Sequence, residues 1–364
     1  MRIAVVGPAH PYKGGGAQHA TELAHRLAAA GHEVSLESWL AQYPRLLYPG
    51  QLTITEPEVP LFDGTRRELS WARPLGWLRV GRRLARAVDV VVLFVYTPVQ
   101  VPAYLGILHG LRGRTRAVAL CNNVLPHERR RVDISLMRTL LRRVDAVFVH
   151  TADQATLAAT LTSAPTYVAV LPPHLPSAPP PAPGTERADP FRRLLFFGVV
   201  RPYKGLDVLL RALATGPPGV ELRIAGEFWG GTSETEKLIA NLGLVDRVEL
   251  RPGYVAVEDV PSTFADVDAL VLPYRAATAS QNAYIAFNNG VPVIATRTGA
   301  LADAVHDGVD GLVCTAGDVE DLAAALRRFY APGEPGRLRS GVRRADVDRV
   351  WEAYVETLVT AASG

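Results

Sequence analysis

The chain has 364 residues, 48% of them hydrophobic and 21% charged, and it carries a formal net charge of +3 at pH 7. This length favours two domains over a single core, and the composition is that of a globular protein. The small net charge argues against nucleic acid as a partner, and no segment is apolar enough to cross a membrane. Because the first residues enter a predicted strand without the pattern of a secretory signal, we expect a cytoplasmic protein.

The first 172 residues alternate apolar runs with amphipathic stretches. A helix is predicted over residues 17–31, where Gly31 stops it. Continuous apolar runs separated by helices favour a parallel, doubly wound sheet with helices on both faces. The predicted strands are residues 2–7, 32–38, 89–96, 116–122, 145–151 and 166–172.

Arginines are concentrated in this first half. Residues 66–86 hold seven arginines and one acidic residue, and a second basic stretch follows at residues 128–143. Trp71, Leu75 and Trp77 stand among the arginines, a mixture that suits peripheral contact with a membrane surface, here the inner face. The alternative is a solvated basic face whose tryptophans pack into the core.

A proline-rich segment divides the chain. Residues 172–190 contain eight prolines and almost no apolar residues, so residues 173–190 are predicted to form a semi-rigid linker. It separates a first domain, residues 1–172, from a second domain, residues 191–340, in which strands and helices alternate again. The final stretch, residues 341–364, is a predicted amphipathic helix that either caps the second domain or crosses back to the first.

Two such sheets are expected to face a common cleft, because ligands bind beyond the carboxyl ends of their strands. Ser280, Gln281 and Asn282 follow a predicted strand, residues 269–274, and stand where a helix begins. Helix N-termini favour anions, and small polar side chains let a phosphate come close. The alternative is that Ser280 only caps the helix.

A loop at the start of the second domain, "GVVRPYKG" (residues 198–205), also joins a strand to a helix. Arg201 and Lys204 lie three positions apart in it with no acidic residue nearby. Two cations in this position suit a diphosphate whose negative charge grows as its bond to a sugar breaks. A solvated basic turn is the alternative, and the spacing does not match a Walker loop.

The matching loop of the first domain, "GPAHPYKGGGAQH" (residues 7–19), places Gly15 and Gly16 at a helix start, where they allow close approach of a ligand. Its spacing is not G-x-G-x-x-G, which weakens a dehydrogenase interpretation, although Glu37 ends the next strand where a ribose could bind.

Four further side chains follow predicted strands. Asn122 and His127 come after one strand of the first domain and could orient a substrate, although His127 could equally be structural. Glu227 and Tyr254 follow two strands of the second domain and could flank a nucleotide.

Together these motifs resemble glycosyltransferase family 4, whose members have the two-domain GT-B fold. The resemblance covers nearly the whole chain and rests on the order and spacing of several segments: "AGHEV" after the glycine loop, "FFGVVRPYKGLDVLLRAL", "RIAGE", "DALVLPY" and "NGVPVIATRTGALADAVHDGVDGLV".

The resemblance implies transfer of a hexose-type sugar from a nucleotide-diphosphate sugar to an acceptor hydroxyl, with retention of configuration. It also implies no metal and no cofactor beyond this co-substrate. Arg201 and Lys204 would hold the diphosphate, Gly15 and Gly16 would border it, and the backbone at Tyr254 and Val255 would receive the base. The acceptor, a small molecule or a lipid-linked compound, would bind the first domain. The alanine- and arginine-rich composition is compatible with a bacterial source of high GC content.

This chain departs from the family pattern at three places. The paired glutamates of the family fall on Ala277 and Ile285, the usual arginine position holds Val199, and the usual first-domain histidine aligns with Asn122. These departures leave two alternatives open: a non-catalytic module of the same fold, or a nucleotide-sugar 2-epimerase, which the shortage of carboxylates disfavours.

Overall fold

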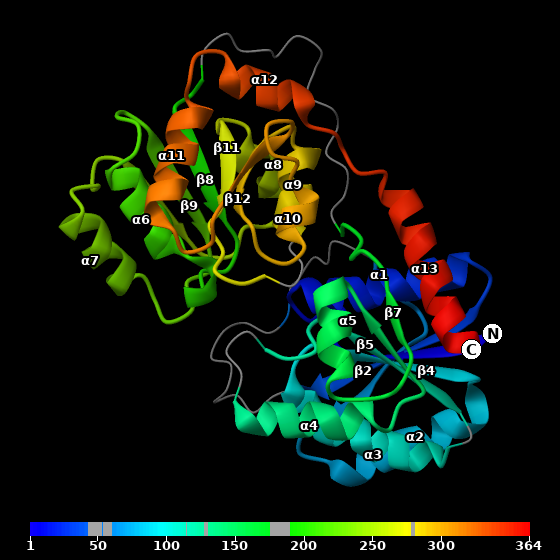
Figure 1. The fold of residues 1–364 in the computed structure, drawn as a ribbon. Coiled ribbons are helices and arrows are strands. Elements are labelled where there is room, and N and C mark those ends of the chain that lie inside the picture. Colours follow the sequence, from blue (N-terminus) through cyan, green and yellow to red (C-terminus); the bar gives the residue numbers. More distant parts are fainter. Residues whose placement is uncertain (43–52, 54–59, 114, 127–129, 175–189, 278–280) are drawn as a thin grey trace. The chain divides into compact units, whose positions relative to one another are not determined.

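A computed structural model describes residues 1–42, 53, 60–113, 115–126, 130–174, 190–277 and 281–364. The chain divides into two compact units: Met1–His174 together with Val347–Gly364, and Leu175–Asp346. Each unit is a parallel sheet with helices on both of its faces (Figure 1). The predicted α/β class with two doubly wound parallel sheets is confirmed.

The first unit contains a seven-stranded sheet in the order β3-β2-β1-β4-β5-β6-β7. The chain runs outward from β1 to β3 and then returns to β4 on the other side of β1, so the strand order reverses between β1 and β4. The strands are β1 (Arg2–Val6), β2 (Glu33–Ala41), β3 (Thr65–Ser70), β4 (Val90–Val95), β5 (Arg116–Cys121), β6 (Ala146–Val149) and β7 (Thr166–Val168).

Helices cover both faces of this sheet. Helices α1 (Gly15–Ala29) and α13 (Val347–Ser363) bury one face, and Leu23, Leu27 and Trp351 lie in that core. The other face is covered by four helices, with Tyr104 and Met137 in its core. These are α2 (Pro74–Ala87), α3 (Val101–Leu111), α4 (Arg131–Leu141) and α5 (Ala152–Ala159), and a short 3-10 turn, Pro98–Gln100, precedes α3.

Strand β3 was not predicted. Its sequence, TRRELS, has no apolar run, because it lies at the edge of the sheet and exposes Arg66, Arg67 and Glu68. Only Leu69 and Ser70 of the strand are buried. Charged side chains on an edge strand discourage pairing with another chain, which explains the polar sequence.

The C-terminal helix α13 is anchored in the first unit by a group of buried aromatic and histidine side chains. The indole of Trp351 donates to the carbonyl of Pro173 at 3.1 Å. The two ring nitrogens of His19 lie 2.9 Å from Nε2 of His174 and 2.9 Å from the hydroxyl of Tyr354. Burial lowers the pKa of His174 to about 3 and that of His150, which stacks on Tyr354, to about 4.

The second unit contains a six-stranded sheet in the order β10-β9-β8-β11-β12-β13. Its strand order reverses between β8 and β11, as that of the first unit does between β1 and β4. The strands are β8 (Arg193–Phe197), β9 (Glu221–Gly226), β10 (Val248–Pro252), β11 (Ala269–Leu272), β12 (Val293–Thr296) and β13 (Gly311–Cys314).

Two helical layers enclose this second sheet. One buried cluster includes Leu209, Leu326 and Leu338, and the other includes Phe264, Ala286 and Leu301. The first layer is α6 (Leu206–Ala214), α7 (Ser233–Asn241), α11 (Val319–Phe329) and α12 (Glu334–Gly341). The second is α8 (Val260–Phe264), α9 (Gln281–Asn288) and α10 (Leu301–Ala304); 3-10 turns lie at Pro202–Lys204 and Val257–Asp259.

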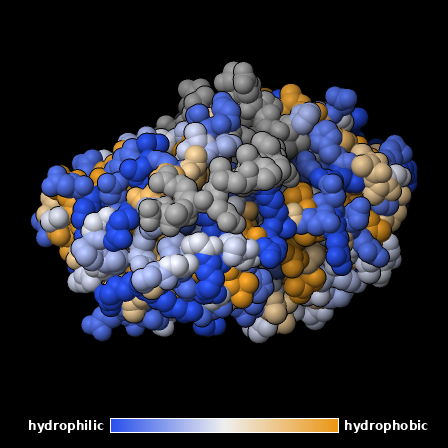
Figure 2. Space-filling view, turned by 90° about the horizontal axis from the view of Figure 1, so that it is seen from above, coloured by the Kyte–Doolittle hydropathy of each residue, from blue (hydrophilic) through white to orange (hydrophobic). Residues whose placement is uncertain are grey.

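Hydrophilic residues predominate on the surface shown in Figure 2, and hydrophobic residues form small, separate patches there. Single exposed apolar side chains such as Val245 and Val309 are ordinary for a folded protein. In the part of the chain that the structure describes, no helix combines the length and hydropathy of a membrane span.

Candidate active site

The loop from β8 to α6 forms the centre of the candidate site in the second unit. It begins at Gly198, where φ is 95°, and ends at Gly205, where φ is 66°. Both values lie in the left-handed region that glycine adopts most easily. A Cβ atom at Gly205 would also lie only 2.1 Å from the carbonyl oxygen of Pro273, so this end of the loop packs directly against the loop that follows β11.

Lys204 and Asn282 come together at this loop, as their places after neighbouring strands predict. A Cβ atom at Gly198 would lie 3.6 Å from Nζ of Lys204 and 3.3 Å from Nδ2 of Asn282. The ammonium of Lys204 lies 5.3 Å from the ring centroid of Tyr274. The amide of Asn282 donates to the carbonyl of Phe197 at 2.8 Å and to the hydroxyl of Tyr274 at 3.1 Å. A cation and an amide therefore border the backbone where the strand order reverses.

Arg201 lies on the side of the loop that faces β9. Its guanidinium carbon is 4.6 Å from the ring centroid of Trp229, a cation–π geometry. The backbone supports this contact, because the amide of Val200 donates to the carbonyl of Glu227 and that of Trp229 donates to the carbonyl of Val200. The two cations of the loop are therefore held by different aromatic rings.

The remaining predicted residues of the second unit lie at the carboxyl ends of its strands. Glu227 follows β9 directly, and Tyr254, which is 47% exposed, follows β10. The amide of Gly253 donates to the carbonyl of Gly226 at 3.0 Å, so these two loops are adjacent. Val255 packs against the buried cluster around α8 and α9.

Gln281 is the first residue of α9 and is partly buried. Ser280, predicted to bind the diphosphate or to cap this helix, lies outside the described residues, and so does His127.

The first unit places three predicted residues at the carboxyl ends of β1 and β5, two strands that β4 separates. Gly15 and Gly16 open α1, and a Cβ atom at Gly15 would have no neighbour within 4 Å. At Gly16 it would lie 3.1 Å from the ring of Tyr96, which follows β4. Asn122 follows β5, and its backbone amide donates to the carbonyl of Val95 at 3.0 Å.

Glu37 does not occupy an open ribose position. Its side chain is 1% exposed and is bound by both terminal nitrogens of Arg83, at 2.8 and 2.9 Å. A carboxylate held in this way is committed to its ion pair, which further weakens the dinucleotide interpretation.

Two family models match the chain. The model described as "Glycosyltransferase Family 4" matches residues 13–176, and the one described as "Glycosyl transferases group 1" matches residues 191–331. The chain belongs to glycosyltransferase family 4. Each matched segment contains the candidate site loops of its unit. The exception is the start of the glycine loop in the first unit, which precedes residue 13.

Similar proteins include D-inositol 3-phosphate glycosyltransferases. That of Geodermatophilus obscurus is 34% identical over 46% of this chain and 39% of its own length. That of Streptomyces griseus is 36% identical over 37% of this chain and 31% of its own length. The chain therefore matches well under half the length of these relatives.

Solved structures with a similar fold cover nearly the whole chain at low sequence identity. Sucrose-phosphate synthase from Thermosynechococcus elongatus aligns over 99% of this chain and 98% of its own, with a TM-score of 0.75 and 18% identity. The Anabaena HepE protein in complex with UDP-glucose aligns over 99% and 100%, with a TM-score of 0.72 and 18% identity. These similarities show the fold, which is the GT-B fold.

The two positions that usually hold glutamates in the family carry apolar residues here, and both pack in an apolar environment. Ile285 is 6% exposed and lies in the core around α9. Ala277 packs against the same cluster. Among the described residues, no group of three or more His, Cys, Asp or Glu side chains could hold a metal ion.

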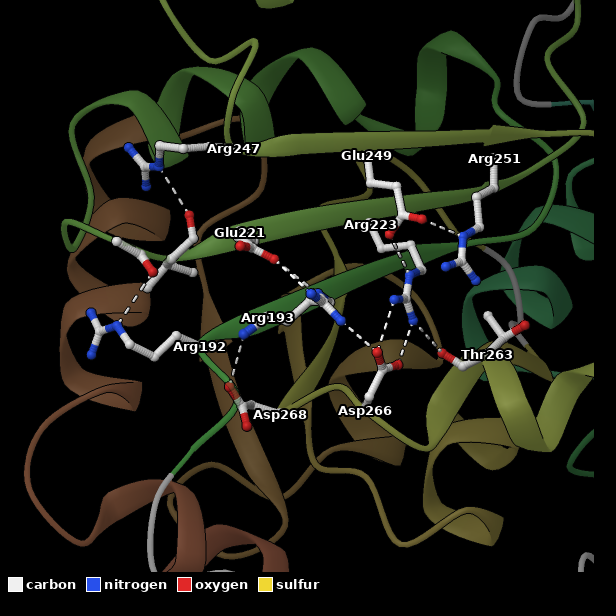
Figure 3. Close-up of polar contacts among 12 residues, drawn as sticks. Arg192, Arg193, Glu221, Arg223, Arg247, Glu249, Arg251, Thr263, Asp266 and Asp268 are labelled. Carbon is white, nitrogen blue, oxygen red and sulfur yellow. Dashed lines mark hydrogen bonds and ion pairs between the residues drawn. The ribbon is translucent and has the colours of Figure 1, made fainter.

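A shallow pocket of about 470 Å³ in the second unit lies away from the candidate site. Arg193 and Glu221, the first residues of β8 and β9, line it together with Arg223, Glu249 and Arg251. Its charges pair with one another: Glu249 binds Arg223 at 2.8 Å and Arg251 at 2.6 Å (Figure 3). Since these cations already have carboxylate partners, the pocket offers little to an anionic ligand.

Sequence reasoning missed the aromatic and charged residues that support the two cations. Trp229, Tyr274 and Arg275 were not singled out, because they lie far along the chain from their respective partners Arg201, Lys204 and Tyr203. Their places directly after strands β9 and β11 were the available signal.

Proposed function

We propose that this family 4 member transfers a hexose-type sugar from a nucleotide-diphosphate sugar to an acceptor hydroxyl, with retention of configuration and without a metal ion. The observation that carries the proposal is the meeting of Lys204 and Asn282 beside Gly198, where the strand order of the second sheet reverses. Doubly wound sheets bind nucleotides at this position. The similarity to the HepE protein, whose solved structure is a complex with UDP-glucose, supports a nucleotide sugar as donor.

In this proposal the second unit binds the donor. Lys204 and Arg201 stabilise the diphosphate, whose negative charge increases as the bond to the sugar breaks. Tyr274 and Trp229 hold these cations in place before the donor arrives, so little reorganisation is required. The leaving diphosphate itself accepts the proton of the acceptor hydroxyl, so no separate general base is needed.

The other donor contacts follow from positions at the strand ends. The backbone at Tyr254 and Val255 receives the base, Glu227 lies beside the ribose, and Ser280, Gln281 and Asn282 provide polar contacts at the start of α9. Ala277 and Ile285 cannot accept hydrogen bonds from their side chains. The donor hydroxyls that glutamates usually bind at these positions are therefore bound by other groups here.

The first unit binds the acceptor, with Gly15 and Gly16 bordering the donor phosphates and Asn122 and His127 near the transferred sugar. Inositol 3-phosphate is the first acceptor to test, because similar proteins are named for it. A lipid-linked acceptor is the second, because Leu75 is 70% exposed and Trp71 is 46% exposed near the exposed Arg79, Arg82 and Arg86.

The proposed membrane contact, at the cytoplasmic face, is tested by flotation with vesicles. Binding to vesicles containing anionic lipid should exceed binding to neutral vesicles and decrease with salt. Leu75→Ser with Arg79→Gln and Arg82→Gln should remove the difference. Equal flotation with both vesicle types would exclude this contact and leave a soluble acceptor.

The donor proposal is tested by thermal shift with UDP, GDP, dTDP and ADP and their common sugars. One nucleotide series should raise Tm in the wild type, and Lys204→Ala and Arg201→Ala should each weaken its binding about tenfold or more. Arg343→Ala, which removes an exposed arginine outside the candidate site, is the control for charge alone.

Product analysis then separates the alternatives. Transfer of the sugar in the presence of EDTA, with retention seen by NMR, supports the proposal. Conversion of the donor sugar alone identifies a 2-epimerase, and nucleotide binding without any turnover identifies a non-catalytic module.

A further inference from the structure

Arg275 joins two loops of the candidate site in the second unit. It follows β11, and its backbone amide donates to the carbonyl of Tyr203 at 2.7 Å. Its Nη1 donates to the carbonyl of Pro202 at 2.9 Å. The same guanidinium binds both carboxylate oxygens of Asp207 in α6, at 2.8 and 2.6 Å. One residue thus holds the turn that carries Lys204 and the first turn of the helix behind it.

These contacts cross the point where the strand order reverses. Strands β8 and β11 are neighbours, but the helices that follow them, α6 and α9, lie in different buried clusters on opposite faces of the sheet. The loops after β8 and β11 therefore leave in opposite directions. Arg275 bridges them, and the close approach of Gly205 to Pro273 adds a second contact between the same two loops.

The Pro202–Lys204 turn lies in a segment whose sequence favours flexibility, which such a bridge restricts. It lies between Gly198 and Gly205, both at positive φ, and glycines increase the conformational freedom of a loop. Ordering each residue of a flexible loop costs backbone conformational entropy. Lys204 adds a flexible side chain whose ammonium must reach a defined place. If the turn were ordered only on binding, that cost would reduce the affinity for the donor.

We propose that Arg275 is a positioning residue that, together with Asp207, fixes the Pro202–Lys204 turn across the site, so that Lys204 is held ready for a nucleoside diphosphate. The inference rests on the proposed function for the identity of that ligand. The hydrogen bond from Arg275 lowers the pKa of Asp207, which keeps the pair ionised at neutral pH.

Two substitutions of opposite charge separate positioning from simple attraction. Arg275→Met removes a positive charge near the ligand, and Asp207→Asn removes a negative one. If the pair acted only through its charge, the first would weaken binding of an anionic nucleotide and the second would strengthen it. If it positions the turn, both should raise the Kd for the nucleotide that stabilises the wild type, by about tenfold each.

The double variant and a conservative variant complete the comparison. Arg275→Met combined with Asp207→Asn should raise Kd no more than about twofold beyond either single change, because the two residues act as one unit. Arg275→Lys keeps the charge but lacks the planar fork, so it should not restore wild-type affinity. Glu221→Gln is the control, since it breaks an ion pair of similar exposure with Arg193 at the opposite ends of the strands.

Hydrogen exchange measured without any nucleotide tests the same inference independently of the proposed function. Amides of the peptide spanning residues 199–206 should exchange faster in Arg275→Met and Asp207→Asn, and at the wild-type rate in Glu221→Gln. Unchanged exchange, or tighter nucleotide binding by Asp207→Asn, would overturn the inference. Failure of UDP, GDP, dTDP and ADP to bind the wild type, with faster exchange in both variants, would reject the proposed ligand and retain the positioning of the turn.

Discussion

At the scale of single residues, Gly205 is constrained twice, by its backbone angle and by its surroundings. Its φ is 66°, and a Cβ atom would lie 2.1 Å from the carbonyl oxygen of Pro273. Gly243 has nearly the same angle, 67°, but nothing lies within 4 Å of the corresponding position. Comparing Gly205 with Gly243 therefore separates the free-energy cost of the backbone angle from that of the contact with Pro273.

We expect Gly243→Ala to lower the free energy of unfolding by about 1 kcal/mol, which is the ordinary cost of a left-handed angle for a residue with a side chain. Gly205→Ala should cost about 3 kcal/mol or more, because the loops after β8 and β11 must also move apart. Urea unfolding measures both. Equal losses in the two variants would mean that the contact with Pro273 relaxes without cost.

At the scale of elements, strands β8, β9 and β10 are connected on one face by charged side chains. Arg223, in the middle strand, is 3% exposed, and its guanidinium binds Asp266 and Glu249 (Figure 3). Arg193 binds Asp266 as well. A buried cation of this kind depends on its partners, because its charge has lost contact with water.

Replacing Asp266 tests this dependence. Asp266→Asn should lower the free energy of unfolding by about 3 kcal/mol, since it leaves the buried Arg223 without its bidentate partner. Glu334→Gln breaks a pair between Glu334 and Arg337 in which the arginine is half exposed, and it should cost no more than about 0.5 kcal/mol. Chemical denaturation compares the two, and a small loss at Asp266 would show that Glu249 alone suffices.

Two buried histidines that pack against helix α13 give the first unit a dependence on pH. His150 and His174 have pKa values lowered by burial to about 4 and about 3, whereas in the unfolded chain they titrate near 6.5. The unfolded state therefore binds more protons below pH 6.5. Stability is fully present above that pH and is lost progressively as the pH falls toward the folded values.

For His150 alone the loss corresponds to roughly 3 kcal/mol between pH 6.5 and pH 4. His150→Phe should flatten the dependence of unfolding free energy on pH over this range, while His109→Gln, at an exposed position of α3, should leave it unchanged. Denaturation at several pH values gives the comparison. An unaltered slope in His150→Phe would show that this ring is accessible to protons in the folded state.

At the scale of the whole molecule, the two units have separate proposed ligands. A nucleotide that binds only the second unit should slow hydrogen exchange in peptides covering residues 198–206 and 226–231 and leave the sheet of the first unit unchanged. Such a result would support the assignment of the donor to the second unit. Protection confined to peptides around Gly15 and Gly16 would move the donor to the first.

The regular elements were readable from the sequence because they depend on local patterns. Continuous apolar runs such as residues 90–95 predict buried parallel strands, and the structure contains them. Strand β3 escaped prediction because edge strands need few apolar residues. The strand "TYVAVLP" was predicted to extend over residues 166–172, but β7 ends at Val168.

The loops of the candidate site were predictable, but the contacts within them were not. A strand followed by a helix fixes which end of the sheet carries a loop, so Lys204 and Asn282 could be placed at the same edge of the sheet. The pairing of Arg201 with Trp229 or of Arg275 with Asp207 depends on side-chain directions and on strand order, which no local pattern encodes.

The position of α13 has a consequence for biosynthesis. Trp351, Tyr354 and Leu358 complete a core whose other members lie largely in the first 148 residues of the described chain, yet the ribosome makes them only after the second unit. At about 10 residues per second, translation of the intervening 172 residues takes roughly 17 seconds. During that interval the apolar surface of α1 and its strands is uncovered, so the nascent first unit is a natural client for a chaperone.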